Sequence, residues 1–212
     1  MKYKHIIWDY NGTLLNDTAL CVSIINNMLT ARKLPTVTAD KYRELFDFPV
    51  KDYYERIGFD FKKESFEKVG TEFIVQYDKK SHTTKLQPGI FKLIKEISEA
   101  GIKQSVLSAR KKEQLYEELE KFEIKHFFEY IYGLDDHYAG GKTEQGKELL
   151  KKTALPENEI ILIGDTTHDC EVANVLGVNA VMVSYGHHTE KKLKKYNFNI
   201  VSNIQEIKKY IF

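Results

Sequence analysis

Acidic, amide, hydroxyl and ammonium side chains stand at the ends of several short apolar runs in this chain. Asp9 ends the first run, and Asn11 follows two residues later, with a tight-turn signal at Gly12-Thr13. The later runs and the helix starts near them carry four more such residues: Ser108, Lys142, Asp165 and Asp169. Ligands of parallel α/β sheets bind outside the carboxyl ends of the strands. We therefore expect these side chains to gather at one sheet edge.

These residue types are the ones needed to hold and transfer a phosphoryl group. Asp9 and Asp165 offer hard oxygen ligands for Mg²⁺, which takes one or two carboxylates and leaves its other positions to water and phosphate. Asp169 lies four residues after Asp165, on the same side if a helix starts there. Ser108 can donate a hydrogen bond to a phosphate oxygen, and Lys142 is a compact cation suited to phosphate.

The elements that must position these residues alternate along the chain. Five short apolar runs predict buried strands, at 6–8, 104–107, 130–132, 160–163 and 180–183. Helical periodicity separates the later runs, at 91–100, 113–122, 143–153 and 170–176. Continuous apolar strands that alternate with helices are typical of a parallel sheet covered on both faces. The fold class is therefore α/β, with a Rossmann-like core.

A long helical segment interrupts this alternation after the first strand. Apolar residues recur at helical spacing through about residue 83, without a convincing strand. A segment of this length is more than a crossover helix. We therefore expect a helical insert at 18–83, and a core formed by 1–17 and 84–212.

Composition restricts the class of protein and its partners. The chain has 212 residues, of which 42% are hydrophobic and 30% charged, as in an ordinary soluble domain with a sizeable core. The formal net charge of +1 gives no global attraction to nucleic acid or to a membrane surface. Two cysteines are too few for a disulfide framework, and no run has transmembrane or signal-peptide character. We expect a cytoplasmic monomer or homodimer.

The four motifs together resemble the haloacid dehalogenase superfamily. An Asp-x-x-Gly-Thr-Leu start at Asp9, Ser108 after the second strand, Lys142 at a helix start and Gly164-Asp-x-x-x-Asp169 occur in that order. The resemblance covers nearly the whole chain, and the helical insert is similar to the cap domain of the phosphoglycolate-phosphatase-like branch. It implies a phosphatase that acts on a small phosphorylated metabolite.

The resemblance also implies a role for each residue. Asp9 would be the nucleophile that forms an aspartyl-phosphate, and Ser108 and Lys142 would act with it on the phosphoryl group. Asp9, Asp165 and the backbone carbonyl of Asn11 would hold Mg²⁺, with Asp169 supporting the metal through water or by orienting Lys142. The phosphate contacts would come from residues of three motifs: Asn11, Gly12, Thr13, Ser108, Ala109 and Lys142.

Asn11 departs from the family pattern, in which an Asp at this position is the acid and base of the two steps. An amide cannot exchange protons, so a contribution of roughly 10²–10⁴-fold should be missing. We expect slow turnover, or a preference for acyl or aryl phosphates, whose leaving groups need little protonation. An engineered Asp-to-Asn change would leave the same sequence.

Two other functions and one specificity hypothesis accompany this interpretation. The chain could bind a phosphorylated ligand with little turnover, or catalyse non-phosphoryl chemistry such as dehalogenation. In the insert, Lys51 and Arg56 could meet a substrate carboxylate or second phosphate, although surface charges are common there. His187 and His188 follow the fifth strand and could border the site.

Overall fold

A parallel sheet forms the core of the computed structural model, which describes residues 2–134 and 141–212. Within these residues the sheet has six strands in the order β5-β4-β1-β6-β7-β8. Their bounds are β1 His5–Trp8, β4 Lys103–Lys111, β5 Tyr130–Leu134, β6 Ile160–Gly164, β7 Asn179–Val183 and β8 Asn199–Val201. Strand β1 lies between β4 and β6, with Ile6 opposite Gln104 on one side and Ile161 on the other.

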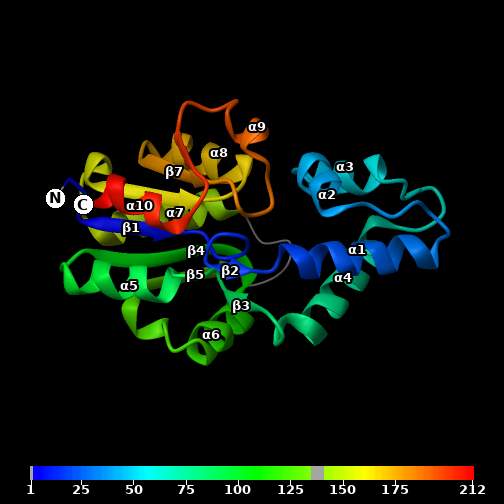
Figure 1. The fold of residues 1–212 in the computed structure, drawn as a ribbon, viewed down its shortest axis with the longest axis horizontal. Helices are drawn as coiled ribbons and strands as arrows, with labels where there is room; N and C mark the ends of the chain where they lie inside the picture. The colour runs from blue at the N-terminus through cyan, green and yellow to red at the C-terminus, as the bar shows by residue number, and fades with distance from the viewer. Residues whose placement is uncertain (1, 135–140) are drawn as a thin grey trace.

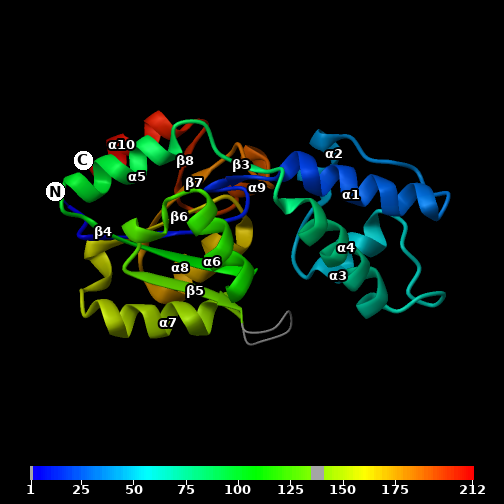
Figure 2. The same cartoon turned by 90° about the horizontal axis from the view of Figure 1, so that it is seen from below.

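Helices cover both faces of this sheet (Figures 1 and 2). One face packs against α5 (Ile90–Glu99), α6 (Lys112–Lys121) and α10 (Ile204–Ile211), and the other against α7 (Lys142–Thr153) and α8 (Thr167–Leu176). Neighbouring residues of β1 belong to opposite hydrophobic clusters, since Ile6 and Trp8 pack on the first face and Ile7 on the second. This two-sided burial explains why β1 is an uninterrupted apolar run. The short elements are α9 (Glu190–Leu193) and two 3-10 turns at Lys125–Phe127 and Glu157–Glu159.

Four helices form a separate lobe at the carboxyl edge of the sheet, on the right of Figure 1. They are α1 (Thr18–Ala31), α2 (Ala39–Leu45), α3 (Val50–Arg56) and α4 (Phe66–Ser81). The lobe has its own hydrophobic cluster, which includes Ile24, Met28 and Tyr53. A two-stranded antiparallel ribbon, β2 (Leu15–Asn16) with β3 (Lys85–Leu86), carries the chain into the lobe and back.

The predicted α/β class and parallel core are confirmed, and each of the five expected strands is present. Strand β8 was not expected. It has three residues and only Val201 is fully buried, so its sequence carries little apolar pattern. The division into 1–17 with 84–212 and 18–83 stays a prediction.

Across residues 2–134 and 141–212, no helix combines the length and the apolar character that crossing a membrane requires. The cytoplasmic location and the monomer or homodimer stay predictions.

Both chain ends lie at the end of the core that faces away from the helical lobe (Figure 1).

Candidate active site

Asp9 stands at the point where the sheet order reverses. It directly follows β1, and its backbone N–H donates to the carbonyl of Ile163 at 2.9 Å, which fixes it beside the end of β6. The chain continues from β1 to β4 on one side, whereas β6 lies on the other. In open α/β sheets such a switch point leaves a crevice for ligands. Asp9 is 8% exposed, at the base of a cavity.

Lys142 is the cation of this site. It is the first residue of α7 and is 4% exposed. Its Nζ lies 2.6 Å from Asp9 Oδ1 and also forms an ion pair with Asp169 Oδ1. Burial alone would lower the pKa of Lys142, but the two carboxylates hold it above its usual range. Lys142 is therefore a permanent positive charge between two acids.

Asp165 is fully buried behind Asp9 and is held by two donors. Thr13 Oγ1 donates to its Oδ1 at 2.9 Å, and the His187 backbone N–H donates to its Oδ2 at 2.6 Å. A Cβ at Gly12, whose φ is +77°, would lie 2.3 Å from Asp165 Oδ2, so only glycine fits at this turn. The Thr13 hydroxyl hydrogen is thus committed to positioning Asp165, where the sequence led us to expect a phosphate contact.

Asp169 combines a structural and an electrostatic task. Its Oδ2 accepts from the Thr166 backbone N–H at 2.9 Å and the Thr166 hydroxyl at 2.7 Å, which completes the capping box of α8. Its other oxygen pairs with Lys142. Burial would raise the pKa of Asp169, but Lys142 holds it below its usual value. The sequence predicted a helical turn between Asp165 and Asp169. Helix α8 begins only two residues after Asp165, so the segment between the two acids is the N-terminal cap of the helix.

The charges of this cluster fit a divalent cation. Ligand oxygens of Asp9, Asp165 and Asp169 all lie within 4.8 Å of one another. Lys142 offsets one of the three negative charges. Burial is the main reason that the pKa of Asp9 is raised and that of Asp165 is raised far above its usual range. Two buried carboxylates short of positive charge are a suitable donor set for Mg²⁺.

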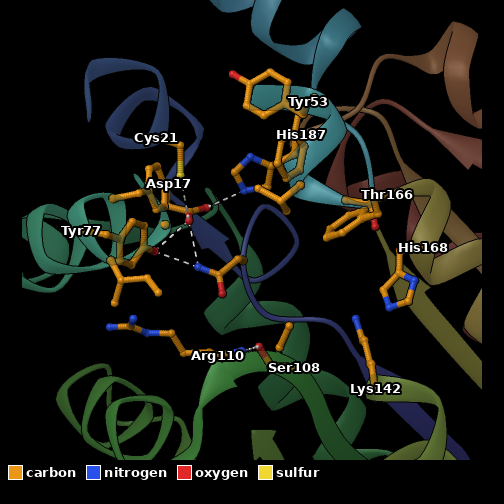
Figure 3. A pocket seen from close by; sticks show the side chains of 18 of the residues that line it. Asp17, Cys21, Tyr53, Tyr77, Ser108, Arg110, Lys142, Thr166, His168 and His187 are labelled. Atoms are coloured by element: carbon orange, nitrogen blue, oxygen red, sulfur yellow. Dashed lines mark hydrogen bonds and ion pairs between the residues drawn. The ribbon is translucent and has the colours of Figure 1, made fainter. Parts of the chain in front are cut away.

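Ser108 and Ala109 lie in the second half of β4, the strand that pairs with β1 just before Asp9. The Ser108 side chain is buried, and its Oγ accepts from the Arg110 backbone N–H at 3.0 Å. Among the described residues, no acceptor takes the Ser108 hydroxyl hydrogen. Figure 3 shows Ser108 and Lys142 on the same side of the cavity, opposite Asp17 and Tyr77. Both Ser108 and Ala109 line the cavity.

The side chain of Asn11 is hydrogen-bonded to Asp17 and Tyr77 and does not serve as a catalytic acid. Its Nδ2 donates to Asp17 Oδ2 and to the Tyr77 hydroxyl, both at 2.8 Å, and Tyr77 in turn donates to Asp17. Because an ionised carboxylate only accepts hydrogen bonds, the amide must present its NH₂ group to Asp17. Both amide hydrogens are therefore committed, and only Oδ1 remains for the site.

Asp17 is a buried carboxylate that accepts hydrogen bonds from several parts of the chain, and local sequence patterns did not indicate this role. It precedes α1 as a helix N-cap, yet its side chain makes no capping bond. Its Oδ1 instead accepts from the Gly12 backbone N–H at 2.9 Å and from His187 Nε2 at 3.2 Å. Burial would lower the pKa of His187, but Asp17 raises it to about 9, while His187 helps hold the pKa of Asp17 down. An Asp before a helix is typical of a cap, so the sequence hides this partner.

A cavity of about 420 Å³ lies between this cluster and the helical lobe. Asp9, Asn11, Ser108 and Lys142 line its core side, and aromatic side chains of α2, α3 and α4 line much of the rest. His187 borders it, as expected, whereas buried His188 accepts from the Thr167 backbone N–H at 3.0 Å.

Lys51 and Arg56 lie outside this cavity. Both are exposed on α3. Lys51 Nζ stands 5.8 Å from the centre of the Phe61 ring, and Arg56 Nε donates to the Asp52 carbonyl at 3.2 Å. Their placement lends no support to the specificity role considered from the sequence.

The family model of haloacid dehalogenase-like hydrolases matches residues 6–183. The chain belongs to this family. The match spans both the core and the helical lobe, and it confirms the resemblance drawn from the four motifs.

Relatives of this haloacid dehalogenase-like hydrolase include named phosphatases. A pyrophosphatase PpaX of Halalkalibacterium halodurans is 26% identical over 207 residues, which cover 93% of this chain and 91% of the relative. A phosphoglycolate phosphatase of Pseudomonas savastanoi is 21% identical, covering 98% and 78%. A haloacid dehalogenase-like hydrolase structure from Streptococcus pneumoniae aligns with a TM-score of 0.85 at 21% identity, covering 100% of this chain and 99% of that one. The predicted enzyme class, a hydrolase with phosphatase relatives, is confirmed.

Proposed function

We propose that this chain is a Mg²⁺-dependent phosphomonoesterase that transfers the phosphoryl group of a small phosphorylated molecule to Asp9 and then to water. One observation carries the proposal. The Asp9 carboxylate is fixed 2.6 Å from a buried Lys142, next to Asp165, at the floor of a cavity large enough for a small ligand. The family and its named phosphatase relatives support the same class of reaction.

Asp9, Asp165 and the backbone carbonyl of Asn11 are the groups that would hold Mg²⁺. When bound, the metal supplies positive charge for the phosphoryl oxygens and lowers the repulsion between them and the Asp9 nucleophile. Asp169 is already paired with Lys142 and held by the α8 cap, so we assign it to orienting Lys142. Thr13 and the His187 backbone N–H orient Asp165.

The protein's own residues then bind and transfer the phosphoryl group. Ser108 donates its hydroxyl hydrogen to a phosphoryl oxygen, and Lys142 offers charge-assisted hydrogen bonds. The backbone N–H of Ala109 is a further donor on the same strand. An Asp9 oxygen attacks phosphorus as the ester P–O bond breaks, and the leaving oxygen departs with the bonding electrons. Water then attacks phosphorus, the Asp9–phosphorus bond breaks, and inorganic phosphate forms.

The side chain of Asn11 contributes to this reaction only as a hydrogen-bond acceptor. Its Oδ1 can accept from the attacking water and so help to orient it, but it takes up no proton. Both hydrogens of its amide are held by Asp17 and Tyr77. The second step therefore lacks a side-chain base at this position, which on its own slows turnover by roughly 10²–10⁴-fold.

Hydrolysis assays with the purified protein test this function. Phosphate release from phenyl phosphate should require Mg²⁺, and Asp9→Asn should reduce it by at least about 10³-fold, since a carboxylate oxygen is the nucleophile. Asp60→Asn, a change at an exposed acid of the helical lobe outside the cavity, serves as the matched control. Tight phosphate-ligand binding without turnover would favour the binding protein, and halide release without phosphatase activity would favour dehalogenation.

A further inference from the structure

We infer that the physiological substrate is an aryl phosphate, in which the leaving oxygen is attached to an aromatic ring. The inference rests on the proposed phosphatase function and names its substrate class. Three features of the cavity carry it, namely an aromatic wall, the pairing of the cations that line it, and an amide in place of a proton donor at position 11.

The wall that faces Asp9 from the helical lobe is aromatic. Cavity-lining rings from α3, α4 and the loop before α3 contact one another at centroid distances of 5.3–6.1 Å, as in Phe46 with Phe48, Phe46 with Tyr53, and Tyr54 with Phe66. Such clusters bind a further ring by offset or edge-to-face packing. Phe48 is 39% exposed although it lines the cavity, so it presents ring surface that the protein itself does not cover.

Among the described residues that line the cavity, every basic side chain outside the Asp9 cluster already has an acidic partner for which a second anionic group on the substrate would compete. Arg110, the large cation nearest Ser108, is paired with Asp78 at 2.6 Å and Glu118 at 2.8 Å, and its guanidinium lies 4.9 Å from the Tyr77 ring centre. Outside the Asp9 cluster, the other described basic side chains of the cavity each have an acid 3.2–3.5 Å away: Lys111 with Glu113, His168 with Glu171 and His187 with Asp17. This disfavours phosphorylated carboxylates and diphosphates.

The environment of the leaving oxygen points the same way. With both hydrogens of Asn11 committed to Asp17 and Tyr77, this residue has no proton to give to an alkoxide. A phenol has a pKa of about 10, as tyrosine does, so a phenolate can depart with the electron pair of the P–O bond and take its proton from water. Acyl phosphates share this advantage but would leave the aromatic wall without a partner.

Four phosphate compounds separate the requirement for an aromatic ring from the requirement for a good leaving group. Phenyl phosphate has a ring and a good leaving group, benzyl phosphate has a ring and a poor one, acetyl phosphate has only the good leaving group, and propyl phosphate has neither. We expect kcat/KM to be highest for phenyl phosphate. Benzyl phosphate should be slower by roughly 10²-fold or more, because its alkoxide needs the missing acid. Acetyl phosphate should fall behind by roughly tenfold through weaker binding.

Aromatic-wall variants test the binding part separately. Phe48→Ala should raise KM for phenyl phosphate by roughly tenfold and leave KM for acetyl phosphate unchanged. Phe73→Leu, inside the wall, removes a second ring and keeps apolar bulk. Phe91→Ala is the control, because Phe91 is similarly exposed, at 45%, but lies on α5 outside the cavity.

The outcomes distinguish this inference from the function on which it rests. If acetyl phosphate, 2-phosphoglycolate or pyrophosphate is turned over as efficiently as phenyl phosphate, the aryl inference is wrong while the phosphatase stands. The same holds if neither wall variant changes KM for phenyl phosphate relative to Phe91→Ala. If none of the compounds is hydrolysed with Mg²⁺, the proposed function itself fails.

Discussion

The side-chain amide of Asn11 donates to the carboxylate of Asp17 across 2.8 Å, and Asp17 is itself paired with His187 at 3.2 Å. An amide is therefore not merely tolerated at position 11. It is the partner that a buried, ionised Asp17 requires, because a second ionised carboxylate there would face the first without a hydrogen between them. The residue that limits proton transfer is thus built into the junction between the core and the helical lobe.

Asn11→Asp should exchange stability for activity on poor leaving groups. The new carboxylate would share a proton with Asp17, so it would be protonated at neutral pH and able to act as an acid. We expect kcat for benzyl phosphate to rise at least about tenfold, and the free energy of unfolding to fall by about 1–3 kcal/mol. Turnover assays and urea unfolding would measure both.

The double variant with Asp17→Asn supplies the control for that change. It returns an amide opposite the new carboxylate. The double variant should therefore lose less unfolding free energy than the two single variants lose together, by at least about 1 kcal/mol. Strict additivity, or a drop in benzyl phosphate turnover for Asn11→Asp, would contradict the assigned contact.

Lys142→Met should destabilise the protein strongly. It removes the only cation paired with Asp9 and Asp169 in the described structure and leaves two buried carboxylates, which costs about 3–5 kcal/mol. Lys147→Met is the matched control, because Lys147 lies on the same helix in an exposed pair with Glu144 and should change stability by less than about 1 kcal/mol. Chemical denaturation at pH 8 tests the contrast, and equal effects would refute it.

Mg²⁺ should stabilise the folded protein through Asp165. A bound dication offsets the charge of Asp9 and Asp165, so at 100 times its Kd it should add about 2.7 kcal/mol to the free energy of unfolding. Removal with EDTA should reverse the gain. Asp165→Asn should abolish it, whereas Asp60→Asn, on the exposed surface of the lobe, should leave it intact. A Mg²⁺ effect that survives Asp165→Asn would place the ion elsewhere.

Stability should fall on the acid side through His5, which lies far from the site at the start of β1. Burial lowers the pKa of His5 to about 4, against about 6.5 in an unfolded chain. Between pH 6.5 and 4 the unfolded state binds the proton and the folded state does not, so folding loses about 1.4 kcal/mol per pH unit from this group. Above pH 6.5 His5 is neutral in both states, so it no longer lowers the free energy of unfolding.

His5→Gln should flatten that slope. Glutamine can keep a hydrogen bond to the Ser105 hydroxyl, which His5 Nε2 contacts at 2.8 Å, and it does not titrate. Substitution of the exposed His126 by Gln is the control. An unchanged pH dependence in the His5 variant would show that the ring is not buried in its neutral form.

The sequence revealed the sheet and the acids at its edge because both leave local signals. β1 and β6 are continuous apolar runs, and Asp9 and Asp165 follow them directly. Lys142 at the start of α7 was found in the same way. These patterns depend only on neighbours in the chain.

The orientation of Asn11 and the hydrogen bonds that meet at Asp17 could not be found from such local patterns. Asp17 and His187 are 170 residues apart, and Tyr77 comes from another helix of the lobe. Asp17 stands where a helix cap is expected, and only the folded structure shows that its carboxylate is turned to other partners. Strand β8 was missed because three residues with one buried apolar side chain carry too little pattern.

Mass spectrometry of the quenched enzyme would show whether Asp9 receives the phosphoryl group. Without a base at position 11, hydrolysis of the Asp9–phosphate should be slow enough for the intermediate to accumulate during turnover of phenyl phosphate with Mg²⁺. We predict a phosphoryl adduct on the peptide that contains Asp9, absent from the Asp9→Asn variant. Steady turnover without any adduct at Asp9, persisting in that variant, would contradict phosphoryl transfer to Asp9.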